Sequence, residues 1–229
     1  MEYREVQAIA RETIAKLRKE VHSGMSLEEV RNCCEAWMFE MGADSFWYYD
    51  VGAFVFSGEE TSFSASGRTY ETPKRILQED DILTIDLSPQ RRGVWGDYAR
   101  TIILEKGKAV EEIGEIRNQE WKQGLLMEEK LHQELLNVAH PEMTFEQLYL
   151  HMNALIAHNG FVNLDFNGNL GHSIEKRRED RIYIEKGNRR CLKDAAMFTF
   201  EPHIAREGLS WGYKKENIYR FVNGHLEEV

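Results

Sequence analysis

Apolar residues recur at helical spacing in two segments of the chain, which share one pattern at an offset of 118 residues. The apolar positions are 27, 30, 34, 37 and 38 in the first segment and 145, 148, 152, 155 and 156 in the second. Each set falls on one face of a helix. Each helix is predicted to open with a capping box and to stop at a glycine: Ser26, Glu29 and Gly42 in the first segment, and Thr144, Gln147 and Gly160 in the second.

A further helical pattern precedes each of these segments, over Tyr3–Val21 and about Glu111–Val138. Strand-like residues follow each of them, over Phe46–Phe56 and Phe161–Phe166. The order helix, helix, strands therefore occurs twice. Amphipathic helices can resemble one another by chance. Here the capping box, the apolar face and the terminal glycine all share the same offset, which favours a duplication. The pattern predicts a single domain with pseudo-twofold symmetry and a functional site at the seam between its halves.

Acidic residues interrupt two apolar stretches in the first half of the chain. Ile82–Pro89 is rich in aliphatic residues, as a strand would be, and carries Asp86. Trp95–Leu104 reads as a second strand, with Asp97 near its start. The turn-like Gln90–Gly93 joins them, so a hairpin would bring the two carboxylates side by side.

The same pattern recurs downstream, where Glu201 lies in the aromatic stretch Ala196–Ile204 and Glu216 begins the stretch Glu216–Phe221. A single acid of this kind most often lies on a solvated strand face or pairs with an arginine. Several unpaired carboxylates buried together are costly, and oxygen-coordinated cations would neutralise them. One histidine, His172, could supply a nitrogen ligand. The ordered set of four acids and one histidine therefore predicts a metal centre.

Composition narrows the class of protein without identifying it. The 229 residues are 42% hydrophobic and 30% charged, which is typical of a globular protein with a sizeable core. The formal net charge of -10 argues against a nucleic-acid partner and against an anionic membrane surface. No apolar run has the length of a signal-peptide core or a membrane span. Cys33, Cys34 and Cys191 match neither a disulfide framework nor a zinc site, so a cytoplasmic protein with reduced thiols is expected.

The acids and the histidine, taken in this order, resemble the metal-binding set of the family that includes methionine aminopeptidases, prolidases and creatinases. Asp86 in Ile-Asp-Leu-Ser-Pro resembles the first ligand of that family, and Asp97 in Trp-Gly-Asp-Tyr-Ala-Arg-Thr resembles the aspartate that bridges two metal ions. His172 matches the Gly-His motif, Glu201 matches the Glu-Pro motif, and Glu216 matches the closing bridging glutamate. The resemblance covers essentially the whole chain.

The resemblance implies both a fold and a chemistry. The fold is α+β, a single pita-bread domain over residues 1–229, with pseudo-symmetric halves of about 1–110 and 111–229 around a curved, mainly antiparallel sheet. The chemistry is aminopeptidase- or prolidase-like hydrolysis of a peptide or small amide bond, in which two divalent ions (Mn, Co, Fe or Zn) activate a bridging water. Glu201 would act as general base as well as ligand. A homodimer is compatible with the resemblance.

Two accessory histidines of the family have no counterpart at the expected positions. Tyr70 takes the place of the first, within Tyr-Glu-Thr-Pro, and Glu179 takes the place of the second. His203, two residues after Glu201, would face the same side of a strand and could act as a catalytic residue in their stead. The alternative for His203 is a partly exposed position at a strand end. Metal binding is therefore better supported than peptidase activity.

Other residues could take part in substrate binding. The aromatic run Phe46–Tyr49 is typical of a core, and a pocket lined by one or two of its rings is the alternative. Lys176, Arg177, Arg178 and Arg181 could bind a substrate carboxylate, but acids are interspersed among them. This mixture of signs favours a solvated loop.

Gly208–Gly212 matches the Gly-x-Ser-x-Gly pattern of serine hydrolases. It lies between two predicted strands and not at a strand-to-helix elbow, so a turn is favoured.

Two functional alternatives keep the same fold. One is a creatinase-like hydrolase of a C–N bond in a non-peptide substrate, and the other is a binding protein whose catalysis is weakened. Retention of the whole ligand set argues against the binding protein, and the missing accessory histidines argue for it.

Overall fold

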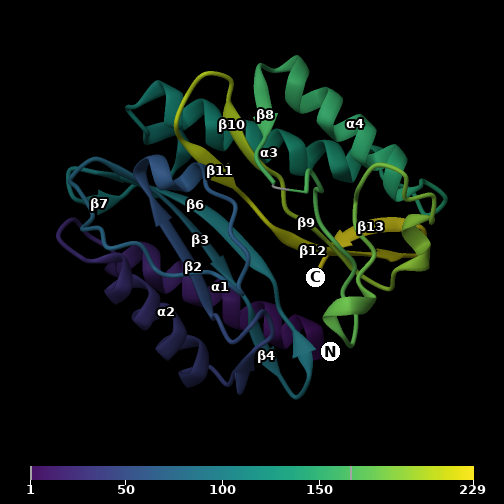
Figure 1. The fold of residues 1–229 in the computed structure, drawn as a ribbon, viewed down its shortest axis with the longest axis horizontal. Coiled ribbons are helices and arrows are strands. Elements are labelled where there is room, and N and C mark those ends of the chain that lie inside the picture. The colour runs from purple at the N-terminus through teal and green to yellow at the C-terminus, as the bar shows by residue number, and fades with distance from the viewer. Residues whose placement is uncertain (1, 166) are drawn as a thin grey trace.

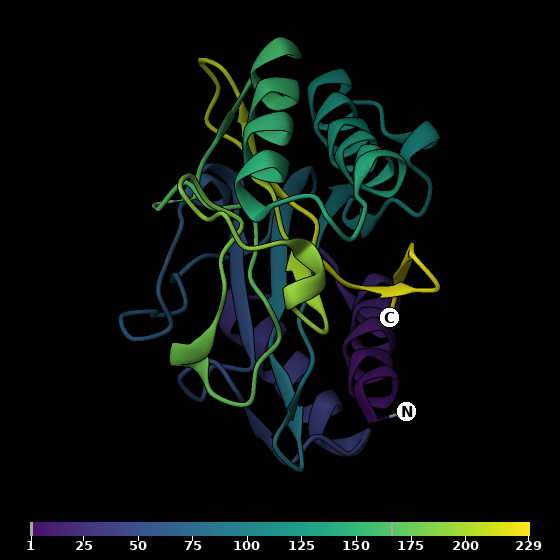
Figure 2. The same cartoon turned by 90° about the vertical axis from the view of Figure 1, so that its right-hand side faces the viewer.

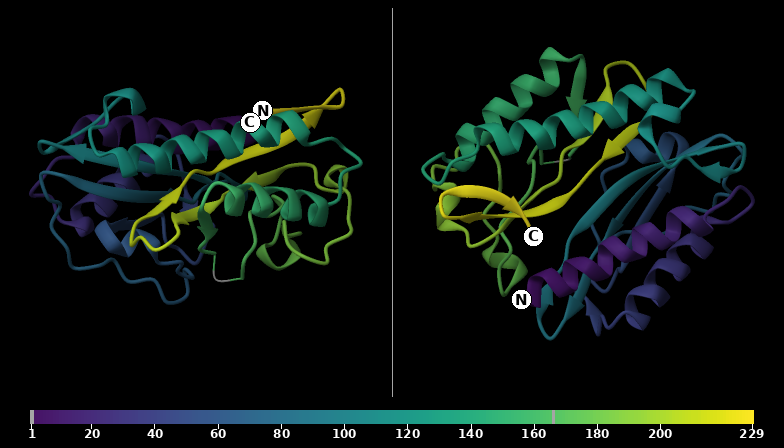
Figure 3. Two further views of the ribbon diagram at one scale, coloured as in Figure 1. Left: turned by 90° about the horizontal axis from the view of Figure 1, so that it is seen from above. Right: turned by 180° about the vertical axis from the view of Figure 1, so that it is seen from behind.

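The computed structural model describes residues 2–165 and 167–229, and its main helices form two pairs. These helices are α1 (Glu2–Glu20), α2 (Leu27–Glu40), α3 (Gln119–Val138) and α4 (Phe145–His158). The pair α1–α2 lies toward one end of the strands and the pair α3–α4 toward the other (Figures 1 and 2). Seen from behind, α1 and α3 lie in front of the strands, and the two ends of the chain are close together (Figure 3). None of the helices in the two described ranges is both long and apolar enough to cross a membrane.

The strand pairs between named strands of the described residues are antiparallel. The first half has sheets of order β2-β3-β6-β7 and β1-β4-β5, with bounds β1 (Ser45–Phe46), β2 (Ala53–Ser57), β3 (Asp81–Leu87), β4 (Pro89–Arg91), β5 (Val94–Trp95), β6 (Tyr98–Glu105) and β7 (Lys108–Ala109). The second half has sheets of order β11-β10-β8 and β13-β12-β9, with bounds β8 (Phe161–Asn163), β9 (Phe198–Phe200), β10 (His203–Arg206), β11 (Gly212–Lys214), β12 (Asn217–Val222) and β13 (His225–Glu228). The predicted α+β class with mainly antiparallel sheets is confirmed.

The two capped helices repeat one local structure. Helices α2 and α4 contain 14 residues each, and each begins with a complete capping box. The N-cap residue of each helix also forms an isolated antiparallel bridge with a later segment of the chain. Ser26 pairs with Ile76, and Thr144 pairs with Cys191. A glycine with positive φ follows each helix, a conformation that other residues adopt only with strain. The predicted starts and stops of both helices are confirmed.

Three predicted elements have different bounds in the structure. Helix α3 begins eight residues later than predicted, because the Asn118 side chain accepts hydrogen bonds from two backbone N–H groups of its first turn. The predicted strand 46–56 is broken by a turn in which Tyr49 has a φ of 58°. The strand predicted over Phe161–Phe166 is shorter, and Phe166 lies outside the described residues.

Apolar side chains form two main clusters. One packs α1 and α2 against β3 and β6 and includes Leu17, Leu27 and Ile102. The other packs α3 and α4 against the strands of the second half and includes Leu131 and Phe145. The second cluster also includes Ile82 of β3 and Ile103 of β6, so the strands of the first half contribute to both clusters.

Strand β6 of the first half lies beside β11 and β12 of the second. The Glu216 backbone N–H donates to the Ala99 carbonyl oxygen over 3.0 Å, and the Lys214 backbone N–H donates to Thr101 Oγ1 over 2.9 Å. Arg100 reinforces the junction, because its Nη1 donates to the Glu216 carbonyl oxygen over 2.8 Å. These bonds fix the acid-bearing segments of the two halves against one another.

Glu128 of α3 is a buried acid that contacts β6 at this junction, and its replacement tests the charge balance of the seam. Its Oε1 accepts a hydrogen bond of 2.7 Å from Thr101 Oγ1, and burial, only partly opposed by that bond, raises the pKa of Glu128 from 4.5 to about 7. The folded protein therefore holds this proton more tightly than the unfolded chain does, and stability is lost as the pH rises from about 4.5 through about 7.

Glu128→Gln removes that titration while keeping the hydrogen-bond acceptor. We expect the variant to gain much more stability relative to wild type at pH 8 than at pH 5. Since the two pKa values differ by roughly 2.5, and each tenfold change in proton affinity is worth about 1.4 kcal/mol, the gain is at most about 3.5 kcal/mol. Urea unfolding at both pH values measures it, and an equal effect of the substitution at pH 5 and pH 8 would contradict the expectation.

Candidate metal centre

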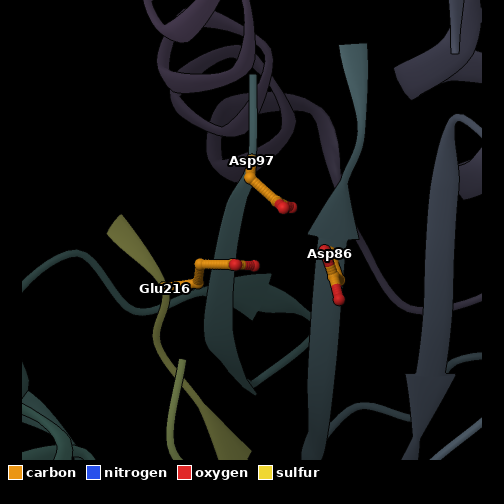
Figure 4. A group of neighbouring side chains, drawn as sticks. All are labelled: Asp86, Asp97 and Glu216. Carbon is orange, nitrogen blue, oxygen red and sulfur yellow. The ribbon is translucent and has the colours of Figure 1, made fainter. Parts of the chain in front are cut away.

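Three carboxylates meet where β3, β6 and β12 come together. Asp86 belongs to β3, whereas Asp97 immediately precedes β6 and Glu216 immediately precedes β12. One ligand atom from each side chain lies within 4.8 Å of the others. Figure 4 shows the three side chains approaching one another from separate segments of the chain. The predicted proximity of the first two acids is confirmed, because β3 and β6 are paired with Asp86 opposite Ala99.

His172 and Glu201 join this group from the second half. His172 Nε2 lies 3.5 Å from Asp97 Oδ2 and 3.8 Å from Glu201 Oε1. The other ring nitrogen, Nδ1, is 2.9 Å from the Ser173 carbonyl oxygen, which can only accept, so Nδ1 carries the proton and the Nε2 lone pair faces the two acids. Burial lowers the pKa of His172 to about 4, so the ring is neutral at pH 7. A neutral imidazole whose second nitrogen donates to a backbone carbonyl is the usual state of a histidine metal ligand.

Burial leaves several carboxylate oxygens without partners. Asp97 Oδ2 and both side-chain oxygens of Glu216 have no hydrogen-bond donor among the described residues, and the two side chains belong to residues only 4% and 0% exposed. Burial, followed by the neighbouring carboxylates, raises the pKa of both acids well above its usual range. A divalent cation would give these oxygens a partner, and a set of carboxylates with one imidazole suits Mn, Fe, Co or Zn. The residues therefore fit a divalent metal centre.

Lys214 is a member of the cluster that sequence reasoning missed. Its Nζ donates to Asp86 Oδ2 over 2.5 Å and lies 3.2 Å from Glu201 Oε2. Burial alone would lower the pKa of Lys214, but the neighbouring acids outweigh burial and raise this pKa well above its usual range. Burial alone would likewise raise the pKa of Glu201, but Lys214 and His172 outweigh it and lower that pKa. One buried ammonium thus balances part of the negative charge of four carboxylates.

A cavity opens over this cluster. Four of the five predicted ligands reach it, while Glu216 is fully buried. One wall is aromatic and consists of Trp47, Tyr48, Phe54, Phe56 and Phe63. The run Phe46–Tyr49 therefore contributes two rings to the cavity, which was the alternative to a purely core position. The cavity combines a polar floor with an apolar wall, as small-molecule and peptide sites commonly do.

His203 also lines the cavity. Its Nε2 lies 2.7 Å from the Thr61 carbonyl oxygen, so Nε2 carries the proton and donates it there. Burial lowers the pKa of His203 to about 4, which leaves the ring neutral at pH 7. His203 is therefore a candidate hydrogen-bond acceptor through Nδ1, and its catalytic role stays a prediction.

The residues at the positions of the accessory histidines do not line the cavity. The Tyr70 hydroxyl accepts a hydrogen bond from the Val55 backbone N–H over 2.8 Å and donates to the Val55 carbonyl oxygen over 3.2 Å. Glu179 is exposed on a short helix and borders a separate, shallow hollow. Neither side chain therefore lines the cavity over the carboxylate cluster. Ser210 lies exposed in the connection between β10 and β11, which supports a turn and not a nucleophile elbow.

The comparison that decides the family covers nearly the whole chain. A family model described as metallopeptidase family M24 matches residues 1–222. The chain belongs to metallopeptidase family M24. This membership confirms the predicted family and the metallopeptidase class of enzyme, and it implies divalent metal ions.

Known M24 proteins resemble this chain in sequence and in fold. A methionine aminopeptidase of Helicobacter pylori is 27% identical over 215 residues, which cover 89% of this chain and 78% of the relative. The X-Pro aminopeptidase of Thermotoga maritima superposes with a TM-score of 0.80 at 19% identity, over 99% of this chain and 58% of that one. The prolidase of Pyrococcus horikoshii gives a TM-score of 0.80 at 17% identity, over 99% of this chain and 60% of the prolidase chain. The M24 chain thus spans less than two thirds of these solved structures, and the likeness confirms its pita-bread fold.

Proposed function

We propose that this M24 chain is a two-metal hydrolase of short peptides or small amides. The observation that carries the proposal is the convergence of buried, partnerless oxygens of Asp97 and Glu216 with the neutral Nε2 of His172. We take the chain as one domain in which both halves, about 1–110 and 111–229, build the centre. The first half would supply two aspartates, and the second would supply the histidine and two glutamates. Cytoplasmic location and a homodimer stay predictions.

Each ligand would have a distinct part. When bound, two divalent ions would lower the pKa of a shared water and polarise the scissile carbonyl. The ions would be held by the carboxylates of Asp86, Asp97, Glu201 and Glu216 and by the imidazole of His172. Glu201 is held in its charged form chiefly by the Lys214 ammonium, so it could accept the proton of the nucleophile and pass it to the leaving nitrogen.

We expect the protein to be a poor general methionine aminopeptidase. Neither residue at an accessory-histidine position reaches the cavity, and removal of one preorganised donor typically lowers turnover by about 10²–10³. The measurement compares kcat/KM for Met-initiated peptides, Xaa-Pro dipeptides and Xaa-Pro-initiated peptides with added Mn, Co or Zn. The variant His203→Ala shows whether His203 replaces part of the missing function. Fast, metal-dependent cleavage of many Met-initiated peptides would contradict the expectation.

A binding protein on the same fold is the second candidate, and Lys214 favours it. Its ammonium contacts Asp86 and Glu201 and so neutralises part of the cluster without any metal. Peptides of the panel that bind in the presence of chelator and are never cleaved with metal would support this candidate. Cleavage of a non-peptide C–N substrate with no cleavage of peptides would instead support the creatinase-like alternative.

A further inference from the structure

The basic residues of segment 176–181 have different surroundings. Arg177 forms two hydrogen bonds of 2.7 Å to the carboxylate of Asp180. Arg178 lies over the Tyr49 ring, 3.8 Å from its centroid. Arg181 instead lines the cavity above the metal centre. The mixed charges favour a solvated loop whose charged residues pair with one another. Arg177 fits this description, but Arg181 does not.

Aromatic rings surround the Arg181 guanidinium. Its central carbon lies 5.4 Å from the Trp47 ring centroid and 5.3 Å from that of Tyr183. The same two rings adjoin His172, with centroid separations of 5.6 and 6.0 Å. Arg181 and the predicted metal ligand His172 therefore adjoin the same two rings. Cation–π contacts of this kind restrict a long side chain and orient its charge.

No carboxylate of the two described ranges lies within 4.0 Å of the Arg181 side-chain nitrogens. Its Nε donates to the Arg178 carbonyl oxygen over 2.8 Å, and its two terminal nitrogens make no hydrogen bond to the described residues. The other cation of the cavity, Lys214, already contacts Asp86 and Glu201. Arg181 thus offers the one cavity cation among the described residues that no carboxylate contacts within 4.0 Å, in a planar form that suits bidentate binding of a carboxylate.

We propose that Arg181 binds the free carboxylate of a short peptide whose apolar side chain packs against the aromatic wall. This assignment rests on the proposed function, because the scissile amide would then lie at the metal centre. A net charge of -10 and four acids in the site repel an anionic ligand at a distance. A peptide with a free carboxylate therefore needs a dedicated cation close to the cleaved bond, and Arg181 is placed to supply it.

The test measures binding and does not require turnover. The probes are 3-phenylpropionate and 3-phenylpropan-1-ol, which share the phenyl group, differ in charge and contain no amide. Titration of the metal-loaded protein, followed by tryptophan fluorescence and calorimetry, gives the ratio of the two affinities. We expect wild type to prefer the carboxylate by roughly 10- to 100-fold, the usual value of a hydrogen-bonded charge pair.

The variants are Arg181→Gln, Arg181→Lys and, as matched control, Arg177→Gln, whose guanidinium is occupied by Asp180. We expect the preference to fall close to one in Arg181→Gln, to be intermediate in Arg181→Lys and to be unchanged in Arg177→Gln. An unchanged preference in Arg181→Gln would overturn the assignment, because the carboxylate would then bind a metal ion or another group. The absence of any preference in wild type would overturn it as well. Failure of peptide hydrolysis alone would count against the proposed function and leave this result standing.

Discussion

Replacement of Glu201 with glutamine is expected to lower kcat for peptide hydrolysis by about 10²–10⁴, the contribution typical of a general base. Glutamine has nearly the same shape but cannot accept a proton at neutral pH. The loss should exceed that caused by a substitution that only weakens metal binding. The reason is that the Glu201 side chain would both hold a metal ion and move the proton. Lys214 keeps its shorter contact, to Asp86, so the variant is expected to fold.

The measurement is kcat at saturating substrate and metal, with circular dichroism as the check on folding. Glu207→Gln is the matched control, because Glu207 is exposed on the segment that follows β10. A kcat of Glu201→Gln within tenfold of wild type would exclude Glu201 as the general base. The metal content of the variant separates loss of the base from loss of the metal ions.

Lys214→Met is expected to destabilise the protein strongly in chelator and much less in the presence of metal. Its ammonium is the buried countercharge of Asp86 and Glu201, and removal of one partner from a buried ion pair typically costs about 3–5 kcal/mol. For a chain of this length that corresponds to a melting temperature lower by roughly 6–20 °C. Divalent ions would replace the lost countercharge, so metal should restore most of the difference.

The comparison uses thermal unfolding of wild type and variant with chelator and with metal. Wild type should also gain on metal addition, by roughly 2.7 kcal/mol per site at 100 times the dissociation constant. Lys193→Met is the control, because Lys193 and its partner Glu142 are 49% and 67% exposed. Equal destabilisation of Lys214→Met with and without metal would show that its ammonium is not the countercharge of the metal cluster.

The cluster of four acids and one histidine was predictable because each of its acids interrupts or borders an apolar strand. Asp86 and Asp97 come together through one hairpin, which local sequence specifies well. The meeting of Glu216 with these two depends on the isolated bridge between Glu216 and Ala99 of β6 across the seam. The repeated helices pointed to that seam, and the family resemblance supplied the order of the ligands.

Lys214 was harder to predict, because it ends β11 whereas Glu216 precedes β12 in another sheet. Two adjacent lysines, Lys214 and Lys215, would both be expected at the solvent-exposed surface. Which of the two side chains points inward depends on the register of β11. Here the Lys214 backbone bonds to Thr101, and its side chain points to the acids. Arg181 and Tyr70 lie outside regular strands, where sequence pattern gives no direction for a side chain.

The most direct test of the metal centre is elemental analysis of protein reconstituted with Mn, Co or Zn and freed of excess metal. We predict about two equivalents of divalent ion per chain in wild type, and weaker binding at both sites in Asp97→Asn, because one carboxylate would serve both ions. Folded, reconstituted protein that holds no stoichiometric metal would contradict the two-metal centre.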